Sequence, residues 1–114
     1  MIFIIDDDEI MAECIADACH QPTQIFTNAI DAINALSQSL PKLIFLDVLL
    51  DGPDGFTFLN ELSSYQDTAK IPVVLVSSLD MQNYNLQDYG IVGKLDKTTM
   101  VPKDIQNYVS QFCA

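Results

Sequence analysis

Five short apolar runs alternate along the chain with longer stretches of helical periodicity, and this alternation constrains the fold more than any other feature. The runs are residues 2–5, 24–27, 43–46, 73–76 and 91–95. Runs that are apolar at successive positions are typical of strands buried on both faces of a parallel sheet. Right-handed crossover helices then cover the two faces. The pattern therefore predicts an α/β fold, a doubly wound five-stranded parallel sheet with helices on both faces.

Apolar residues at three- and four-residue steps predict the helices between these strands. The stripes are Met11, Ile15 and Ala18; Ala29, Ile30, Ile33, Ala35 and Leu36; Phe56, Leu59 and Leu62; and Ile105, Tyr108, Val109 and Phe112. A fifth set, Met81, Tyr84, Leu86 and Tyr89, fits such a stripe only loosely amid Asn and Gln. We expect the helix in that region to be short or mobile.

Length and charge narrow the possible functions. The 114 residues suit one domain, residues 1–114, with 49% apolar residues for one core. Sixteen acidic residues against five lysines give a net charge of -11, and such a field repels phosphate backbones, so direct nucleic-acid binding is not expected. The N-terminus lacks the basic flank of a signal peptide, and no apolar run approaches the ~20 residues of a membrane span. We expect a cytoplasmic protein without a membrane anchor.

The cysteines favour neither a metal site nor a disulfide framework. Cys14, Cys19 and Cys113 are odd in number and show no C-x-x-C spacing. Free cysteines usually behave as small hydrophobic residues. We expect all three to be reduced and mostly buried.

Polar side chains follow four of the five apolar runs, at the point where each predicted strand ends. They are Asp6, Asp7, Asp8 and Glu9 after the first strand, Asp47 after the third, Ser77 and Ser78 after the fourth, and Lys97 after the fifth. In an open parallel sheet, functional residues gather at the carboxyl ends of the strands, near the point where strand order reverses. We therefore expect carboxylates, a hydroxyl and an ammonium group to meet at one edge.

These residue types together suit phosphoryl transfer. Neighbouring carboxylates repel each other unless a cation or protons neutralise them, and hard oxygen ligands suit Mg²⁺. Mg²⁺, a lysine and a hydroxyl donor can each neutralise or bind an equatorial oxygen of a transferring phosphoryl group. A carboxylate is an established nucleophile for that group. The sequence thus predicts a magnesium site with an aspartate acceptor.

Four separated segments carry a family resemblance over essentially the whole chain. They are residues 4–8, Leu46 and Asp47 with the loop 52–55, residues 72–77, and Lys97. In this order, each at a strand end, they resemble the CheY-like receiver domain of response regulators in two-component signalling. The resemblance implies a flavodoxin-like sheet. It also implies a signalling module that catalyses its own phosphorylation and hydrolysis, not a metabolic enzyme.

The resemblance also assigns roles to individual residues. Asp47 corresponds to the phosphoacceptor, and Asp6 and Asp7 to the acidic pair that holds Mg²⁺, with Asp7 favoured as the direct ligand. The main-chain carbonyl of Leu49 is the further metal ligand. Ser77 corresponds to the switch hydroxyl and Lys97 to the lysine that pairs with the acyl phosphate.

The implied partners are proteins. A sensor histidine kinase or a histidine phosphotransfer protein would supply the phosphoryl group, and a downstream protein target would read the result. Phosphorylation would shift the loop after Ser77 and the face formed by residues 81–89, the fifth strand and the last helix. We expect a monomer or a weak homodimer, with Lys94 and Lys103 on the face used for self-association.

Three positions depart from the family pattern. Thr98 stands where a proline usually follows the lysine, Lys94 replaces an aromatic switch residue, and Asp51 replaces a frequent proline. The active site is intact, but the output side is atypical. Because a cis bond before a non-proline residue costs roughly 2.5–4 kcal/mol, we expect a trans bond between Lys97 and Thr98.

Other interpretations remain open at this stage. Asp8 fits a helix N-cap better than a ligand, and His20 fits a helix end better than a phosphodonor. Residues 5–8 also fit the start of a haloacid-dehalogenase-type phosphatase with Asp6 as nucleophile, although no acidic pair follows the lysine and Asp47 would then have no role. A pseudo-receiver that docks without phosphorylation is the third alternative.

Overall fold

The computed structural model describes residues 1–47, 55–77 and 90–113, apart from the side chains of residues 55 and 56. Within these residues five strands form one parallel sheet in the order β2-β1-β3-β4-β5. The strands are β1 (Ile2–Ile5), β2 (Thr23–Phe26), β3 (Leu43–Leu46), β4 (Val73–Ser77) and β5 (Ile91–Asp96). The predicted parallel sheet is confirmed, with strand ends within one residue of those expected.

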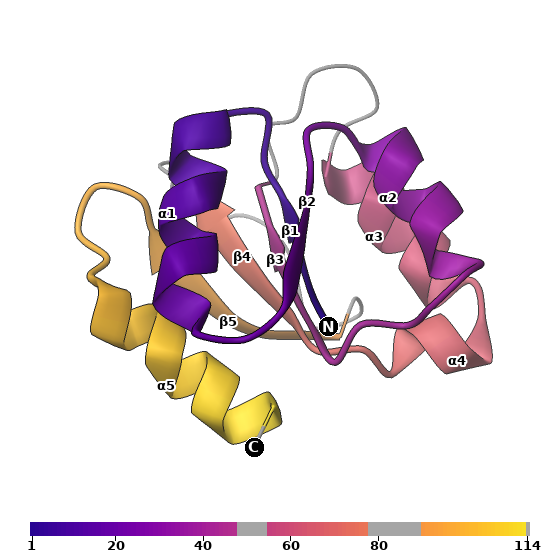
Figure 1. Ribbon diagram of the computed structural model, residues 1–114. Coiled ribbons are helices and arrows are strands. Elements are labelled where there is room, and N and C mark those ends of the chain that lie inside the picture. The colour runs from indigo at the N-terminus through magenta and orange to yellow at the C-terminus, as the bar shows by residue number, and fades with distance from the viewer. Residues whose placement is uncertain (48–54, 78–89, 114) are drawn as a thin grey trace.

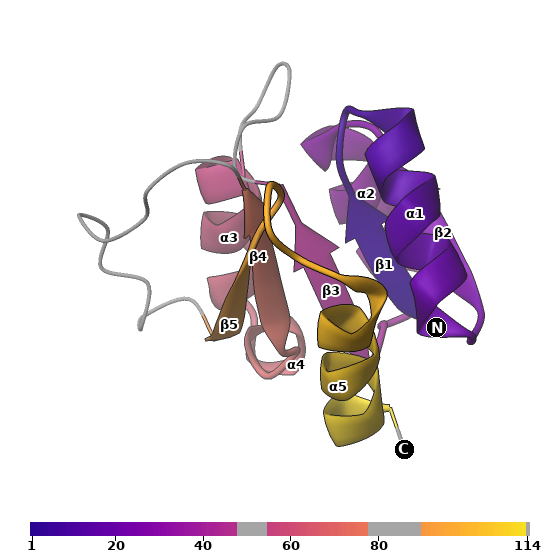
Figure 2. The same cartoon turned by 90° about the vertical axis from the view of Figure 1, so that its left-hand side faces the viewer.

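Helices cover both faces of the sheet, as predicted (Figure 1). They are α1 (Glu9–Cys19), α2 (Ala29–Leu36), α3 (Gly55–Ser63), the short α4 (Gln66–Ala69) and α5 (Pro102–Phe112). Figure 1 shows α1 and α5 on one side of the sheet and α2 and α3 on the other, and the view of Figure 2 has α1 and α5 toward the reader. No helix among the described residues is both long enough and apolar enough to cross a membrane.

The three inner strands supply the middle of two hydrophobic cores. Successive side chains of a strand point to opposite faces, so Phe3, Ile44 and Leu75 pack toward α2 and α3, whereas Ile4, Phe45 and Val74 pack toward α1 and α5. All residues of β1, β3 and β4 are buried. This double burial explains why these strands are apolar at every position except Ser77, the last residue of β4.

The two edge strands are less deeply buried. Residues of β5 alternate between half-buried and exposed, and β2 buries only Phe26 fully. At β5 the pairing with β4 shifts by one residue next to Val73 and Val74. Beyond this shift Gly93 lies directly beneath the ring of Tyr108, which comes from α5. The absence of a side chain at Gly93 is thus what lets α5 pack closely on the edge of the sheet.

The ends of α1 follow the local rules that the sequence suggested. Asp8 is the N-cap, and its side chain accepts hydrogen bonds from the backbone N–H groups of Ile10 and Met11 at 3.1 and 3.2 Å. His20 ends the helix with a left-handed backbone, φ 53°, which is uncommon outside glycine. Both residues therefore have the structural roles expected of them.

Several details differ from the sequence expectations. Ile30 belongs to the apolar stripe predicted for α2 but is exposed, and the buried positions of that helix are Ala29 and Ala32. Cys14 lies on the solvent side of α1, while Cys19 and Cys113 are buried, and all three are free thiols. Helix α4 was not predicted, because four residues are too few to show a stripe. The helix expected over residues 81–89 lies outside the described residues.

Candidate functional site

The sheet brings Asp6 and Asp47 to adjacent positions. Ile5 and Leu46, the last residues of β1 and β3, are partners in the parallel register, and the N–H of Asp47 donates to the carbonyl of Ile5 at 2.9 Å. Strand order reverses between β1 and β3, since the chain goes from β1 outward to β2 and returns on the other side. The two carboxylates thus lie at the topological switch point, where open α/β sheets bind ligands.

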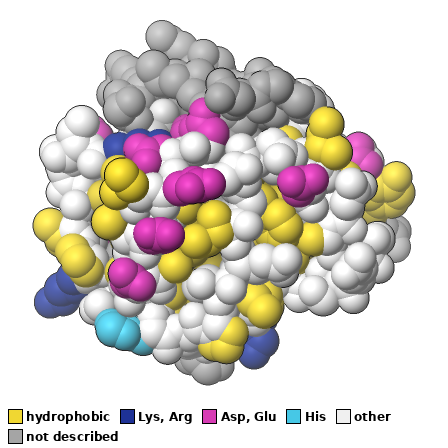
Figure 3. All heavy atoms as spheres, turned by 45° about the horizontal axis from the view of Figure 1, so that its top comes forward, with side chains coloured by type: hydrophobic (Ala, Val, Ile, Leu, Met, Phe, Trp, Pro, Cys, Tyr) yellow, Lys and Arg dark blue, Asp and Glu magenta, His cyan; other side chains and the backbone are white. Residues whose placement is uncertain are grey.

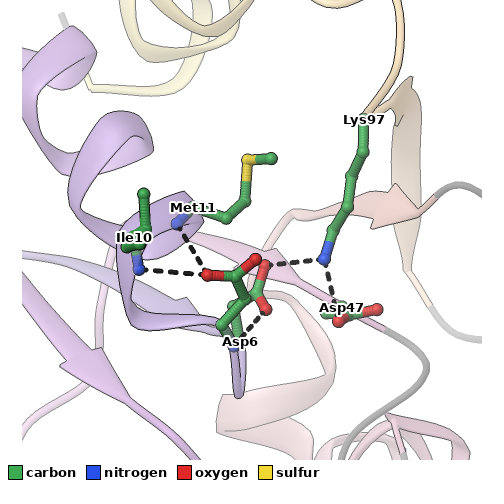
Figure 4. Close-up of polar contacts among 6 residues, drawn as sticks. Asp6, Ile10, Met11, Asp47 and Lys97 are labelled. Carbon is green, nitrogen blue, oxygen red and sulfur yellow. Dashed lines mark hydrogen bonds and ion pairs between the residues drawn. The ribbon is translucent and has the colours of Figure 1, made fainter.

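Lys97 joins these two carboxylates. Its Nζ lies 3.0 Å from Oδ2 of Asp6 and 3.0 Å from Oδ2 of Asp47, and Figure 4 shows the side chain reaching down between them. The backbone N–H of Lys97 donates to the carbonyl of Ser77 at 3.2 Å, which ties the residue after β5 to the end of β4. Lys97 is therefore part of the site and not a solvated surface charge.

Burial makes this cluster electrostatically strained. Asp6 is 1% exposed and Asp47 is 5% exposed. Desolvation raises the pKa of Asp6 above its usual range, and the charge of Asp47 raises it further, although the N–H of Asp8 and the ammonium of Lys97 oppose both effects. Burial lowers the pKa of Lys97, but its hydrogen bond to Asp47 and its ion pairs with Asp47 and Asp6 outweigh this and leave the pKa raised. One ammonium group thus offsets two adjacent carboxylates only in part.

Asp7 completes a donor set that suits a divalent cation. One carboxylate oxygen each from Asp6, Asp7 and Asp47 lie within 4.8 Å of one another, and Asp7 is the most exposed of the three. Among the described residues, Oδ2 of Asp6 is buried without a well-formed hydrogen bond, and it faces Lys97 only as an ion pair. Three hard carboxylate donors, one of which carries a buried oxygen without a hydrogen bond, fit Mg²⁺.

The surface beside the site is acidic. Figure 3 shows Asp and Glu side chains following one another across this face toward the single histidine. Glu9, Glu13 and Asp17 lie at four-residue steps on the exposed side of α1, which ends at His20. The acidic field therefore attracts cations toward the end of the sheet where Asp6 and Asp47 lie.

The remaining expected site residues divide into two groups. Ser77 ends β4, is 5% exposed and pairs in register with Asp96, the residue before Lys97. It therefore lies at the same edge of the sheet as Asp47 and Lys97. Leu49, Asp51 and Ser78 fall outside the described residues.

Asp96, the last residue of β5, was not among the expected site residues. The peptide bond between Lys97 and Thr98 is trans, as expected. Asp96 accepts two hydrogen bonds from Thr98, which lies two residues further along the chain. The signal was present in the Asp-Lys-Thr spacing, since Asp side chains commonly bond to groups two residues on.

The comparisons with known proteins agree with this geometry. The chain matches the model of the response regulator receiver domain over residues 2–109. The response regulator PleD of Caulobacter vibrioides is 33% identical over 89 residues, which is 75% of this chain and 20% of PleD. The DNA-binding dual master transcriptional regulator RpaA of Synechocystis is 30% identical over 113 residues, 96% of this chain and 46% of RpaA.

A solved structure shows the same fold. The receiver domain of the sensor histidine kinase PA1611 from Pseudomonas aeruginosa, with a magnesium ion in its active-site cleft, superposes with a TM-score of 0.83 at 16% identity, covering 97% of this chain and 94% of that one. The chain spans a fifth to about half of PleD and RpaA. It belongs to the response regulator receiver domain family, the signalling modules of two-component systems, and the phosphatase and docking alternatives are not favoured.

Proposed function

We propose that Asp47 accepts a phosphoryl group from a phosphohistidine on a sensor histidine kinase or a histidine phosphotransfer protein. The observation that carries the proposal is the cluster of Asp6, Asp7, Asp47 and Lys97 at the switch point of the sheet. An oxygen of the Asp47 carboxylate attacks phosphorus as the bond from phosphorus to the imidazole nitrogen breaks. The imidazole leaves and Asp47 becomes an acyl phosphate.

The residues around Asp47 have distinct roles in this step. Lys97 lies within hydrogen-bond distance of Asp47 and would pair with an equatorial oxygen of the phosphoryl group. Ser77, at the neighbouring strand end, would donate its hydroxyl to another. When bound by the carboxylates of Asp6, Asp7 and Asp47 and the carbonyl of Leu49, Mg²⁺ supplies positive charge at the phosphoryl oxygens. Asp6 and Asp7 would hold the cation, with Asp7 favoured as the direct ligand, and the magnesium ion in the active-site cleft of the PA1611 receiver supports that choice.

The same set of residues would let the domain catalyse its own phosphorylation and later hydrolysis. We propose that residues 1–114 form one receiver domain, which works in the cytoplasm as a signalling module. The hydroxyl of Ser77 would turn toward the acyl phosphate. The adjoining loop and the face around β5 and α5 would then shift to a conformation that a downstream protein target binds. The domain would be a monomer or a weak homodimer, with Lys94 and Lys103 on the face used for self-association.

Intact-mass spectrometry tests the proposal. The protein is incubated with acetyl phosphate and Mg²⁺, with a parallel sample in EDTA and a third with beryllofluoride. We expect one added phosphoryl group with Mg²⁺, none in EDTA, and removal of the added mass by hydroxylamine, which cleaves acyl phosphates. No added mass together with no beryllofluoride binding would contradict the proposal.

A further inference from the structure

The long, flexible side chain of Lys97 reaches from the edge of the sheet to the carboxylates that follow two inner strands. Lys97 directly follows β5, the half-buried edge strand, and its N–H is held by the carbonyl of Ser77 at 3.2 Å. The ammonium ends on Asp6 and Asp47, both at 3.0 Å. Since four rotatable bonds separate Cα from Nζ, the direction of the side chain depends on how firmly its backbone is held.

The residues on either side of Lys97 are joined to each other. Oδ1 of Asp96 accepts the backbone N–H of Thr98 at 2.8 Å and the hydroxyl of Thr98 at 2.6 Å. The carbonyl of Asp96 accepts the N–H groups of Thr99 and Met100 at 3.1 and 2.8 Å. Asp96 thus holds the three residues after Lys97 through both its side chain and its backbone. The two bonds from Thr98 also keep the pKa of the exposed Asp96 carboxyl below its usual range.

This turn stands where the family pattern has a proline. A proline fixes its own φ angle and has no N–H to donate, so it constrains the backbone after the lysine without hydrogen bonds. No ring fixes the φ angle of Thr98. Its N–H and its hydroxyl both donate hydrogen bonds to the carboxylate of Asp96. In this chain a pair of charge-assisted hydrogen bonds stands where the family pattern has the covalent constraint of a proline ring.

We propose that Asp96 and Thr98 are positioning residues that fix the backbone on both sides of Lys97 and so direct its ammonium toward the acceptor carboxylate. The proposal rests on the proposed function, because it assumes that Lys97 assists phosphorylation of Asp47. The competing explanation is that the turn only starts α5, whose first residue is Pro102. The two explanations differ in whether the effect of the turn passes through Lys97.

A kinetic cycle separates these explanations. Phosphorylation by acetyl phosphate at saturating Mg²⁺ is followed in Asp96→Ala and Thr98→Val, each alone and combined with Lys97→Met. We expect each single variant to be slower by roughly three- to tenfold, the size expected when a hydrogen bond is lost, and no further slowing in the Lys97→Met background. Thr98→Ser should restore most of the rate, and Thr99→Val serves as the matched control. Equal slowing with and without Lys97, or no slowing, would overturn the proposal.

A measurement without phosphate or metal keeps the proposal testable if the kinetics fail. If the ammonium of Lys97 is held in place, the two protons of its ε-methylene group have different chemical shifts. A freely rotating side chain averages these two shifts. We expect inequivalent signals in the metal-free protein and in Thr99→Val, and averaged signals in Asp96→Ala. Signals unchanged in Asp96→Ala would overturn the positioning role. Failure of wild-type phosphorylation alone would instead count against the role of Asp47.

Discussion

The ammonium of Lys97 lies 3.0 Å from Oδ2 of Asp47, although fifty residues separate them in the chain. The same nitrogen lies equally close to Asp6, so a single cation faces two buried carboxylates. Because the pKa of Lys97 is raised, this pairing stabilises the folded protein below the unfolded lysine pKa of about 10.4 and is lost as pH rises through the folded pKa. The pKa of Asp6 is also raised, which shows that the pairing leaves part of its burial cost in place.

Replacing Asp6 by Asn should therefore stabilise the metal-free fold at neutral pH. The raised pKa means that the charged form of Asp6 opposes folding above the unfolded aspartate value of about 3.9. Stability of the wild type should fall as pH rises from there through the folded pKa of Asp6, and Asp6→Asn should lack that fall. Thermal midpoints in EDTA between pH 4 and 8 measure both effects. A lower midpoint for Asp6→Asn at pH 7 would contradict the electrostatic description of the cluster.

Magnesium should stabilise the wild type, since it binds the carboxylates only where the fold brings them together. A ligand at ten times its Kd adds about 1.4 kcal/mol to the free energy of unfolding. We expect the thermal midpoint to rise with millimolar Mg²⁺ and the rise to vanish in Asp7→Ala. Asp17→Ala, an exposed aspartate on α1 away from the cluster, is the control. An unresponsive wild type would leave the cluster without a metal role.

Asp8 should matter for stability and not for metal binding. Its side chain caps α1 through the N–H groups of Ile10 and Met11, and loss of such a cap costs about 1 kcal/mol. Asp8→Ala should lower the free energy of unfolding by that amount, and Asp8→Asn should keep most of it. Urea denaturation measures the change. The role of Asp8 as a cap alone would be wrong if Asp8→Asn removed the response to Mg²⁺.

The fold and most of the site could be predicted from the sequence because both depend on local pattern. Apolar runs marked the strands. Asp6, Asp47 and Lys97 directly follow β1, β3 and β5, and Ser77 is the last residue of β4. Parallel strands carry their carboxyl ends to one edge, so the convergence of these residues followed from topology alone.

What could not be predicted depends on packing or on very short segments. The position of Lys97 Nζ between two carboxylates depends on a side chain with several free torsions. Helix α4 is held by a buried threonine, whose hydroxyl donates to the carbonyl of Leu62 at 2.6 Å, and a single residue leaves no periodic signal. The exposure of Ile30 follows from which side of α2 meets the sheet, which a short apolar stripe does not settle.

Gly93 should resist substitution because of Tyr108. A Cβ at Gly93 would collide with the hydroxyl and ring of Tyr108, so Gly93→Ala must displace the ring from the edge of β5. We expect a loss of about 1–3 kcal/mol in the free energy of unfolding, the range for overpacking. In a Tyr108→Ala background the same substitution should cost much less. Equal costs in both backgrounds, measured by denaturation, would show that the ring is not the obstacle.

The identity of the phosphorylated residue tests the proposed role of Asp47 most directly. Wild type, Asp47→Asn and Asp6→Asn are incubated with acetyl phosphate and Mg²⁺ and weighed intact. We expect one added phosphoryl group on the wild type, the same added mass formed more slowly on Asp6→Asn, because Asp7 and Asp47 remain to bind Mg²⁺, and none on Asp47→Asn. Added mass on Asp47→Asn with none on Asp6→Asn would contradict that role and would make Asp6 the nucleophile, as in the phosphatase alternative.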